Sequence, residues 1–401
     1  MPVNLNKPNQ LHPVAGIRIA TAQAGIRYTD RDDMVLFEIA EGANIAAVFT
    51  KNKYCAAPVV LARSHLEKNS PRALLVNAGN ANAGTGELGM LNAQESCMSV
   101  GQSLKIEQEQ VLPFSTGVIG EQLPMNKMNV GIDALATNLS ADNWLLAAQA
   151  IMTTDTIAKG ISEKVEIGGT VVTITGIAKG SGMICPNMAT LLSYVATDAE
   201  VDKKLLEQFL KRGADNSFNR ITVDSDTSTN DALVLIATGK SNVKISHNDN
   251  EFYLALERIL VSLATAVVRD GEGATKFVKI VVNNGVNESD CEKIAYSVAH
   301  SPLVKTALFA SDPNWGRILA AIGKAPTDQL DINLIDIHIN GEALIEAGQP
   351  ASSYTEEIGQ SVFGQEEITI VIDLHLGSDS YHVWTSDLSH EYVTINADYR
   401  S

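Results

Sequence analysis

The chain has 401 residues, of which 45% are hydrophobic and 19% are charged, and its formal net charge is −17. This length and hydrophobic content are typical of a globular protein that buries a large core and divides into two or more domains. The negative charge argues against binding of nucleic acid, because the phosphates would be repelled. It favours cationic small molecules, although solubility alone also accounts for it.

Targeting and redox signals point to one compartment. No apolar run approaches the roughly 18 residues of a membrane span, so no membrane association is expected. The first residues, MPVNLNKP, contain no apolar segment of the kind found in signal peptides, and none is predicted. The four cysteines are far apart and form no CxxC pair. Neither a zinc site nor a disulfide framework is therefore expected, and the prediction is a reduced, cytoplasmic protein.

Strands and helices alternate in the first half of the chain. Short buried strands are predicted at residues 44–49 and 73–77. Apolar residues recur with helical spacing over 142–152, and Asp142 is the predicted N-cap of that helix. This alternation is typical of an α/β or α+β protein.

Two hairpins are predicted further along the chain. The first turns at Gly168–Gly169, because two glycines supply the positive φ angles of a tight turn. The second turns at residues 377–380, near the C-terminus. The strands of the two hairpins are predicted at 165–167, 171–175, 368–374 and 381–385.

Two amphipathic helices are predicted between these hairpins. Residues 203–211 and 252–268 each place their leucines on one face. The second helix ends at a glycine-rich turn, residues 269–273 (RDGEG).

The most informative segment is residues 179–193, KGSGMICPNMATLLS. Glycine-punctuated turns lead to a small residue, Ala189, and then to Thr190, after which an apolar run predicts a buried strand. A self-cleaving threonine needs this arrangement, since the hydroxyl must reach the preceding carbonyl. After cleavage, the freed α-amine is its base, with a pKa of roughly 7.7–8.0. The spacing alone is also compatible with an ordinary strand that begins after the Ala-Thr pair and has no catalytic role.

The same segment resembles the signature of the ornithine acetyltransferase family, the glutamate N-acetyltransferases of arginine biosynthesis. The resemblance recurs in order along nearly the whole chain. Its further motifs are AVFTKNK (47–53), NAGNANA (77–83), STGVIG (115–120), MTTDT (152–156), FNRITVD (218–224), RDGEGATKF (269–277), DPNWGR (312–317) and INADYRS (395–401).

The resemblance implies a fold, a processing event and a reaction. The fold is the layered α/β sandwich of the DmpA-type aminopeptidases, with an N-terminal nucleophile. Self-cleavage between Ala189 and Thr190 gives an α chain, 1–189, and a β chain, 190–401, which associate, as an α2β2 heterotetramer or larger. The reaction transfers acetyl from N2-acetylornithine to glutamate through an acetyl-threonine ester. Some members also use acetyl-CoA, and the residues of this chain do not assign it to either group. No cofactor or metal is implied.

The resemblance also assigns site residues. Thr190 is the nucleophile, and Thr116 and Gly117 form the oxyanion hole, where a hydroxyl and a backbone N–H stabilise the tetrahedral intermediate. A Thr-Gly turn is the ordinary alternative for these two residues. The substrate-binding positions are Thr153, Lys179, Thr190, Glu272, Asn396 and Ser401. Among them, Lys179 suits a carboxylate and Glu272 suits an ammonium group.

The sequence does not indicate a catalytic cysteine or a nucleotide-binding site. Cys185 has no histidine partner in any motif, so it is interpreted as a loop or core residue. Residues 77–86 are glycine-rich but match neither GxGxxG nor Walker A, so nucleotide binding is not predicted. Two alternatives to acetyl transfer stay open: a threonine amidohydrolase or aminopeptidase with the same nucleophile, and a binding protein that kept the fold. Ornithine release without glutamate would indicate the first, and an uncleaved chain would indicate the second.

Overall fold

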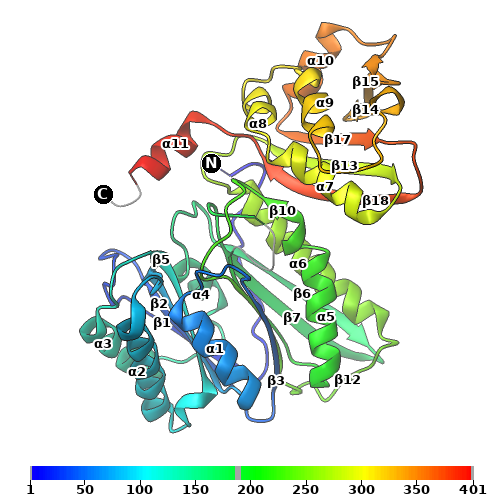
Figure 1. The fold of residues 1–401 in the computed structure, drawn as a ribbon. Coiled ribbons are helices and arrows are strands. Elements are labelled where there is room, and N and C mark those ends of the chain that lie inside the picture. The colour runs from blue at the N-terminus through cyan, green and yellow to red at the C-terminus, as the bar shows by residue number, and fades with distance from the viewer. Residues whose placement is uncertain (1, 186–190, 399–401) are drawn as a thin grey trace. The chain divides into compact units, whose positions relative to one another are not determined.

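The structure is a computed structural model that describes residues 2–185 and 191–398. The chain folds into two compact units (Figure 1). The described residues of unit 1 lie within Met1–Leu5, Arg220–Ser225 and Val268–Ser401, and unit 2 comprises Asn6–Asn219 and Asp226–Val267. The chain therefore passes between the units more than once, and neither unit is one continuous stretch of sequence.

One sheet of unit 2 has the strand order β1-β2-β4-β5. The strands β1 and β4 both run antiparallel to β2, and β5 runs parallel to β4. The predicted strand at 73–77 is confirmed, and it continues to Asn80. The bounds are Ile17–Ala22 for β1, Met34–Ile39 for β2, Ala73–Asn80 for β4 and Val111–Val118 for β5.

The second sheet of unit 2 has the order β3-β11-β8-β7-β6. The pair β8 and β11 is parallel, and the other neighbours are antiparallel. The predicted hairpin is confirmed in β6 and β7, where Gly168 and Gly169 have φ angles of 57° and 81°. The bounds are Asn44–Phe49 (β3), Lys159–Ile167 (β6), Thr170–Lys179 (β7), Leu192–Thr197 (β8) and Ala232–Ala237 (β11), with a small separate pair, Glu200–Val201 (β9) and Lys244–Ile245 (β12).

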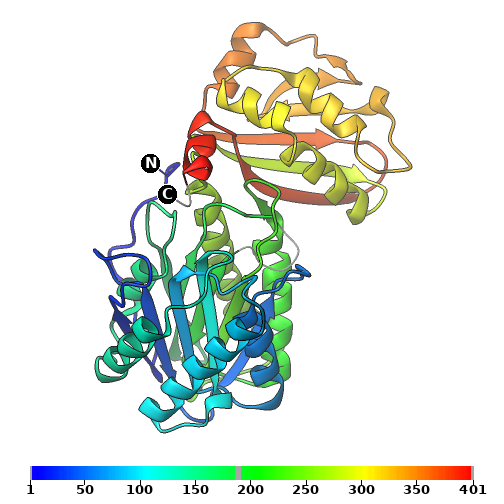
Figure 2. The same cartoon turned by 60° about the vertical axis from the view of Figure 1, so that its left-hand side comes forward.

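The two sheets lie face to face, with helices outside them (Figures 1 and 2). Helices α1, α2 and α3 cover the first sheet, and α5 and α6 cover the second. Both predicted amphipathic helices are confirmed as α5 and α6. The predicted helix at 142–152 is confirmed as the shorter α4, whose N-cap is Asn143 rather than Asp142. The bounds are Ala57–Lys68 (α1), Gly86–Leu104 (α2), Met125–Thr137 (α3), Trp144–Ala150 (α4), Lys203–Asp215 (α5) and Asn250–Arg269 (α6).

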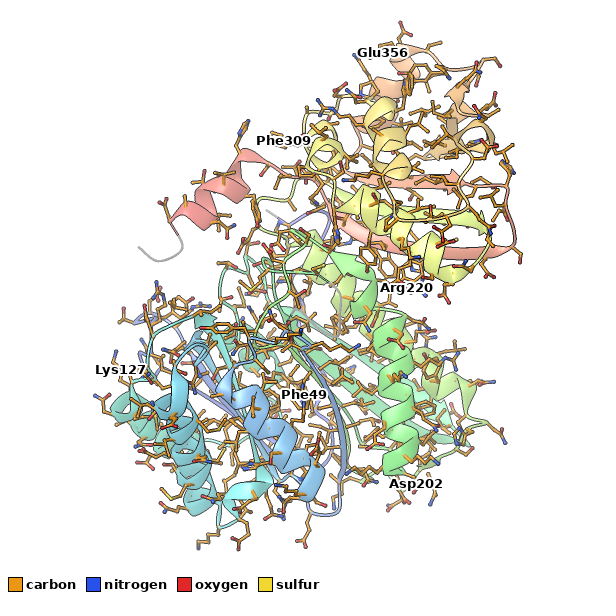
Figure 3. All side chains as sticks on the ribbon, viewed as in Figure 1. Phe49, Lys127, Asp202, Arg220, Phe309 and Glu356 are labelled. Atoms are coloured by element: carbon orange, nitrogen blue, oxygen red, sulfur yellow. The ribbon has the colours of Figure 1, made fainter. Side chains whose placement is uncertain are left out.

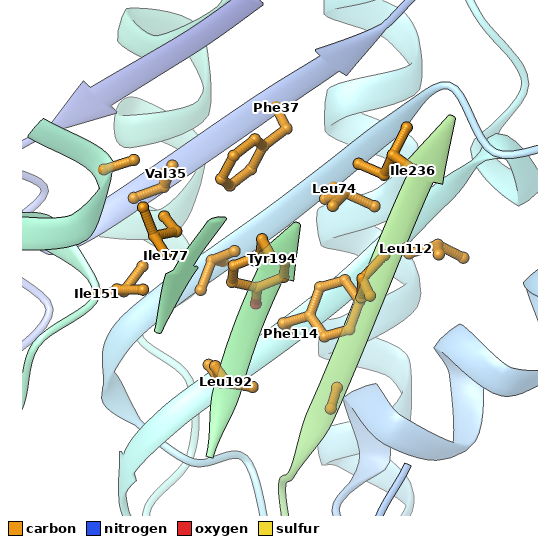
Figure 4. Close-up of a cluster of buried hydrophobic side chains, with 14 of the residues drawn as sticks. Val35, Phe37, Leu74, Leu112, Phe114, Ile151, Ile177, Leu192, Tyr194 and Ile236 are labelled. Carbon is orange, nitrogen blue, oxygen red and sulfur yellow. The ribbon is translucent and has the colours of Figure 1, made fainter. Parts of the chain in front are cut away.

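The core of unit 2 fills the space between the sheets. Tyr194 lies between Phe37 and Phe114, with ring centroids 5.2 and 5.3 Å away (Figure 4). Every residue of β8 is buried, and Leu192 and Tyr194 face this core because alternate residues of a strand point to the same side. The buried strand predicted after Thr190 is thereby confirmed.

Unit 1 is built on a sheet of order β10-β18-β13-β17-β14-β15-β16. Helices α7, α8, α9 and α10 bury a separate apolar core against it (Figure 1). The strands are Ile221–Thr222 (β10), Phe277–Gly285 (β13), Asp336–Ile339 (β14), Glu342–Glu346 (β15), Gln349–Pro350 (β16), Glu367–Asp373 (β17) and Asp379–Ser386 (β18). The helices are Glu288–Ala299 (α7), Pro302–Phe309 (α8), Trp315–Gly323 (α9), Glu356–Phe363 (α10) and His390–Ala397 (α11).

The second predicted hairpin is wrong. Both of its strands exist, as β17 and β18, but they do not pair with each other. Strand β13 lies between them, parallel to β17 and antiparallel to β18. Strands that are neighbours in sequence pair in most sheets but not in all, and here a strand from about 90 residues earlier takes the central place.

Several charged side chains lie on the surface, away from the two cores. Lys127, Asp202 and Glu356 lie exposed at or next to helix starts (Figure 3). No helix within residues 2–185 and 191–398 is both long enough and apolar enough to cross a membrane.

Candidate functional site

The ends of two neighbouring strands place Thr116 and Gly117 against Ala78 and Gly79 of β4. Gly117 has a φ of 128°, which side-chain-bearing residues rarely adopt. A Cβ atom there would lie 2.7 Å from the nitrogen of Asn80 and closer still to the carbonyl group of Gly79. The backbone of β5 is therefore held tightly against β4 at the residue whose N–H is expected in the oxyanion hole.

A buried lysine lies beside this strand end. Lys179 is the last residue of β7 and is only 9% exposed. Its Nζ donates a hydrogen bond to Thr116 Oγ1 at 3.2 Å. Since Oγ1 accepts from a cation, the hydroxyl proton of Thr116 remains available and becomes a stronger donor to a negatively charged oxygen.

The Thr153 segment is tied to the same strand end by Asp155. Asp155 Oδ2 accepts from the N–H of Thr153 at 3.0 Å, and Oδ1 accepts from the N–H of Gly180 at 2.7 Å. Oδ1 also forms a fully buried ion pair with Lys159 Nζ at 2.7 Å. Gly180 follows Lys179 directly, so Asp155 joins the Thr153 segment to the end of β7.

The charge of Asp155 is fixed by its surroundings. Burial acts to raise the pKa of this carboxyl, but the charges of Lys159 and Lys179 and the N–H of Gly180 outweigh burial. The pKa of Asp155 is therefore well below its usual range, and the group is ionised at neutral pH.

Asn230 holds the backbone next to Thr116 in place. Its Nδ2 donates to the carbonyl oxygens of Ala81 and Ser115, at 2.6 and 3.0 Å. Its Oδ1 accepts from the hydroxyl of Thr229 at 2.5 Å, which sets the orientation of the amide. Because Ser115 immediately precedes Thr116, Asn230 holds the backbone at the point where the proposed oxyanion hole begins.

In unit 1, Glu272 lies 8% exposed in the glycine-rich turn after α6. Asn396, on α11, donates from Nδ2 to Glu272 Oε2 at 2.7 Å. The neighbouring Gly273 has a φ of 68°, and a Cβ there would lie 2.6 Å from both Ser389 Oγ and the nitrogen of Tyr392. Glycine at this position therefore allows α11 to pack on the turn.

Further hydrogen bonds anchor the segment that leads into α11. Asp387 accepts from the N–H and the hydroxyl of Thr275, at 2.8 and 2.5 Å, and from the N–H of Lys276 at 3.0 Å. Ser389 Oγ donates to the carbonyl oxygen of Gly273 at 2.7 Å. Lys305 Nζ donates to Thr385 Oγ1 at 3.0 Å, and burial lowers the pKa of Lys305 to about 8.

The sequence as a whole matches one protein family. A model of the ArgJ family matches residues 18–401. The chain belongs to the ArgJ family. The resemblance to ornithine acetyltransferases that the motifs carry is thereby confirmed.

Proteins similar to this chain include curated and solved members of the ArgJ family. The arginine biosynthesis bifunctional protein ArgJ of Pseudomonas fluorescens (strain Pf0-1) is 50% identical over 406 residues, covering all of both chains. The protein of the same name from Pseudomonas syringae pv. tomato (strain ATCC BAA-871 / DC3000) is 49% identical with the same coverage. A crystal structure of the Bacillus halodurans ArgJ is 37% identical, covering 52% of this chain and 100% of that one, with a TM-score of 0.50.

The structure groups the site residues predicted from the family's motifs. In unit 2, hydrogen bonds connect Thr116, Lys179 and the Thr153 segment, and Gly117 follows Thr116. In unit 1, Glu272 and Asn396 are in contact. Three predicted residues, Ala189, Thr190 and Ser401, lie outside the described residues. Cys185 is a buried loop residue, as interpreted from the sequence.

The sequence interpretation missed the residues that hold the site residues in place. Asp155 lies inside the motif MTTDT (152–156), but nothing in the sequence around it indicated a role. Asn230 and Asp231 end a polar run, residues 224–231, that directly precedes the buried strand β11. A polar run before a buried strand is the one signal in the sequence for buried hydrogen bonds at that strand end. Within residues 2–185 and 191–398, no group of three or more His, Cys, Asp or Glu side chains is placed to hold a metal ion.

Proposed function

We propose that this chain is a self-processing glutamate N-acetyltransferase that moves the acetyl group of N2-acetylornithine to glutamate. Its products are ornithine and N-acetylglutamate. The observation that carries the proposal is membership of the ArgJ family over residues 18–401, with 50% identity to a full-length ArgJ protein of arginine biosynthesis. Since the curated relatives are named bifunctional, acetyl-CoA is included as a second acetyl donor.

The proposed chemistry is a ping-pong transfer on Thr190. The hydroxyl of Thr190 attacks the acetyl carbonyl, and the α-amine of Thr190 takes the hydroxyl proton. When the amide bond breaks, that proton passes to the departing α-amine of ornithine, and an acetyl ester remains. The α-amine of glutamate then attacks the ester, and the threonine hydroxyl is restored.

The geometry of unit 2 supports an oxyanion hole at Thr116 and Gly117. Both tetrahedral intermediates place a negative charge on the former carbonyl oxygen. The Thr116 hydroxyl, polarised by Lys179, and the N–H of Gly117 are the proposed donors. Both are pre-oriented by the close contact with β4, so little reorganisation accompanies charge development.

Charge complementarity supports the proposed substrate contacts. N2-acetylornithine carries a carboxylate and an ammonium group, and glutamate carries carboxylates. Lys179 supplies a buried cation for a carboxylate, while Thr153 lies on the segment tied to it. Glu272, oriented by Asn396, supplies a carboxylate for an ammonium group. Ser401 is assigned a substrate contact on the family motif alone.

Self-cleavage between Ala189 and Thr190 is part of the proposal. It divides the chain into an α chain, 1–189, and a β chain, 190–401, which associate as an α2β2 heterotetramer in the cytoplasm. One comparison supports the division: the whole solved chain of the Bacillus halodurans relative corresponds to 52% of this chain. A match to about half of the chain is expected when the relative consists of two separate fragments.

The proposed function is tested by the dependence of ornithine release on glutamate. Purified protein is incubated with N2-acetylornithine, and ornithine is measured with and without glutamate. We expect one ornithine per active site without glutamate and continuous turnover with it, because the acetyl ester needs an amine acceptor. Continuous release without glutamate would indicate a hydrolase and contradict the transferase.

A further inference from the structure

Two segments of unit 2 that carry predicted substrate contacts are bonded to each other at two places. Asp155 accepts the N–H of Thr153 at 3.0 Å through Oδ2 and the N–H of Gly180 at 2.7 Å through Oδ1. A second bond between the same segments joins the hydroxyl oxygens of Thr154 and Ser181, which are 2.7 Å apart. The first segment is therefore folded around the carboxyl group and is held against the second segment by hydrogen bonds.

These bonds connect Asp155 to three of the predicted site residues. Because Asp155 takes the N–H of Thr153, the hydroxyl is the donor of Thr153 that remains for a ligand. Gly180 has a φ of 148°, so the chain turns directly after Lys179, and Asp155 holds this turn. Lys179 in turn donates to Thr116 of the proposed oxyanion hole. Asp155 therefore orients Thr153 directly and Thr116 through Lys179.

The carboxyl group of Asp155 is buried together with an ammonium group of opposite charge. The side chains of Asp155 and Lys159 are both 0% exposed, and Lys159 Nζ lies 2.7 Å from Oδ1. Lys159 is the first residue of β6 and pairs with Ala178 of β7, directly before Lys179. The ion pair therefore lies at the strand end that carries the site.

Stability alone is a weak explanation for this ion pair. The cost of removing two charges from water offsets their attraction, so apolar residues of the same volume often stabilise a core equally well. A carboxylate does what an apolar residue cannot do, because it accepts two backbone N–H groups from different segments at once. The buried charge of Lys159 then allows that carboxylate to stay ionised inside the protein.

We propose that Asp155 is a positioning residue for acetyl transfer, which holds Thr153 and Lys179 at the spacing that the substrate and the oxyanion hole require. Asp155 acts through its bonds to the N–H groups of Thr153 and Gly180 and does not contact the substrate. This inference rests on the proposed function, in which Thr153 and Lys179 are substrate contacts. A misplacement of about 1 Å in such contacts costs up to ~10²-fold in rate.

The test separates the hydrogen bonds of Asp155 from its balance of charge with Lys159. Asp155→Asn keeps the volume but replaces one carboxylate oxygen by an NH₂ group, which cannot accept from an N–H. It also removes the counter-ion of Lys159, so we expect this variant to lose thermal stability and activity together. The double variant combines Asp155→Asn with Lys159→Met. Both of its new side chains are uncharged and of similar volume to the originals, so we expect its melting temperature to return close to that of wild type.

We expect the double variant to stay impaired although it is stable. Its kcat/KM for N2-acetylornithine should lie about tenfold or more below that of wild type, because one of the two N–H groups has lost its acceptor. Intact mass gives the fraction of divided chain, and kcat is expressed per divided chain, so that slow self-cleavage is not counted as slow transfer. Asp155→Ser replaces Asp155→Asn if the amide prevents folding, since the smaller side chain leaves space for water at the two N–H groups.

The control is Asp198→Asn. Asp198 is also buried, and its carboxyl accepts from the N–H of Thr173 at 2.9 Å. Thr173 lies in the first half of β7, so the control weakens the same strand away from Lys179. We expect the control to lose stability in thermal unfolding and to keep the wild-type kcat/KM per divided chain.

Two outcomes would overturn the inference. A double variant that regains activity together with stability would mean that Asp155 only balances the charge of Lys159. An Asp198 control as impaired as the double variant would mean that any weakening of β7 slows transfer. Failure of the proposed function is seen separately, because the wild-type protein would then show no glutamate-dependent release of ornithine.

Discussion

At the scale of single residues, the candidate site depends on side chains whose neighbours set their charge. Lys179 donates to Thr116, and Asp155 is ionised by the two lysines that it faces. None of these relations is visible in the spacing of the residues, because Thr116 and Lys179 are 63 residues apart. The family motifs predict which residues matter, and the structure supplies the contacts that explain why.

The hydroxyl of Thr116 is expected to be a direct donor to the oxyanion. Replacing it by alanine removes one donor, so kcat for ornithine release should fall by about 10²-fold. Thr116→Ser keeps a hydroxyl within reach of Lys179 and should stay within about tenfold of wild type. Steady-state kinetics of both variants check this. Equal losses in the two variants would show that the hydroxyl is not the contributing group.

Lys305 should make stability depend on pH. Its pKa is about 8 in the folded chain and 10.5 in an unfolded one, because burial disfavours the charged ammonium group. Between these values the unfolded chain binds more protons, so the free energy of unfolding should rise with pH, by about 2 kcal/mol from pH 8 to pH 10.

Urea denaturation across this pH range measures the effect, and Lys305→Met is the matched variant. Methionine fills a similar volume and does not titrate, so its stability should lack this rise. A methionine variant with the same pH dependence as wild type would assign the effect to other groups.

At the scale of elements, the proposed oxyanion hole depends on the contact between β4 and β5, the strand that carries Thr116 and Gly117. Gly117 and Gly120 both have positive φ angles, 128° and 86°, but only Gly117 would bring a Cβ against the neighbouring backbone. Gly120 has nothing within 4 Å of that position. Comparing substitutions at the two glycines therefore distinguishes the cost of a steric clash with β4 from the cost of a positive φ angle.

Alanine substitution at these positions should give different losses. Gly120→Ala carries only the cost of a positive φ angle, roughly 1–2 kcal/mol. Gly117→Ala should destabilise the chain by about 2 kcal/mol more, since β5 must move away from β4. Thermal unfolding of the two variants tests this, and similar melting temperatures would contradict the close contact.

The element scale also shows where sequence interpretation succeeds and where it does not. The hairpin at Gly168–Gly169 was predictable, because its turn chemistry and its strand pairing are both local. The places of β17 and β18 in their sheet were not, since β13, from residues 277–285, lies between them. Local patterns identify strands, but the order of strands in a sheet depends on contacts between distant segments.

At the scale of the whole molecule, the family-like motifs are distributed over both units. Those near Thr116, Thr153 and Lys179 belong to unit 2, and those near Glu272 and Asn396 belong to unit 1. The layered α/β class and the family were predictable, because they rest on patterns that extend along nearly the whole chain. The residues that hold the site in place were not predictable, since Asn230 reaches Ser115 across 115 positions of sequence.

The measurement that tests the central claim most directly is the intact mass of the protein under denaturing conditions, before and after brief exposure to N2-acetylornithine. The account predicts two chains divided between Ala189 and Thr190, of which only the second gains a single acetyl group. The Thr190→Ala variant should give one undivided chain without acetyl. An undivided wild-type chain that gains no acetyl would contradict the threonine mechanism.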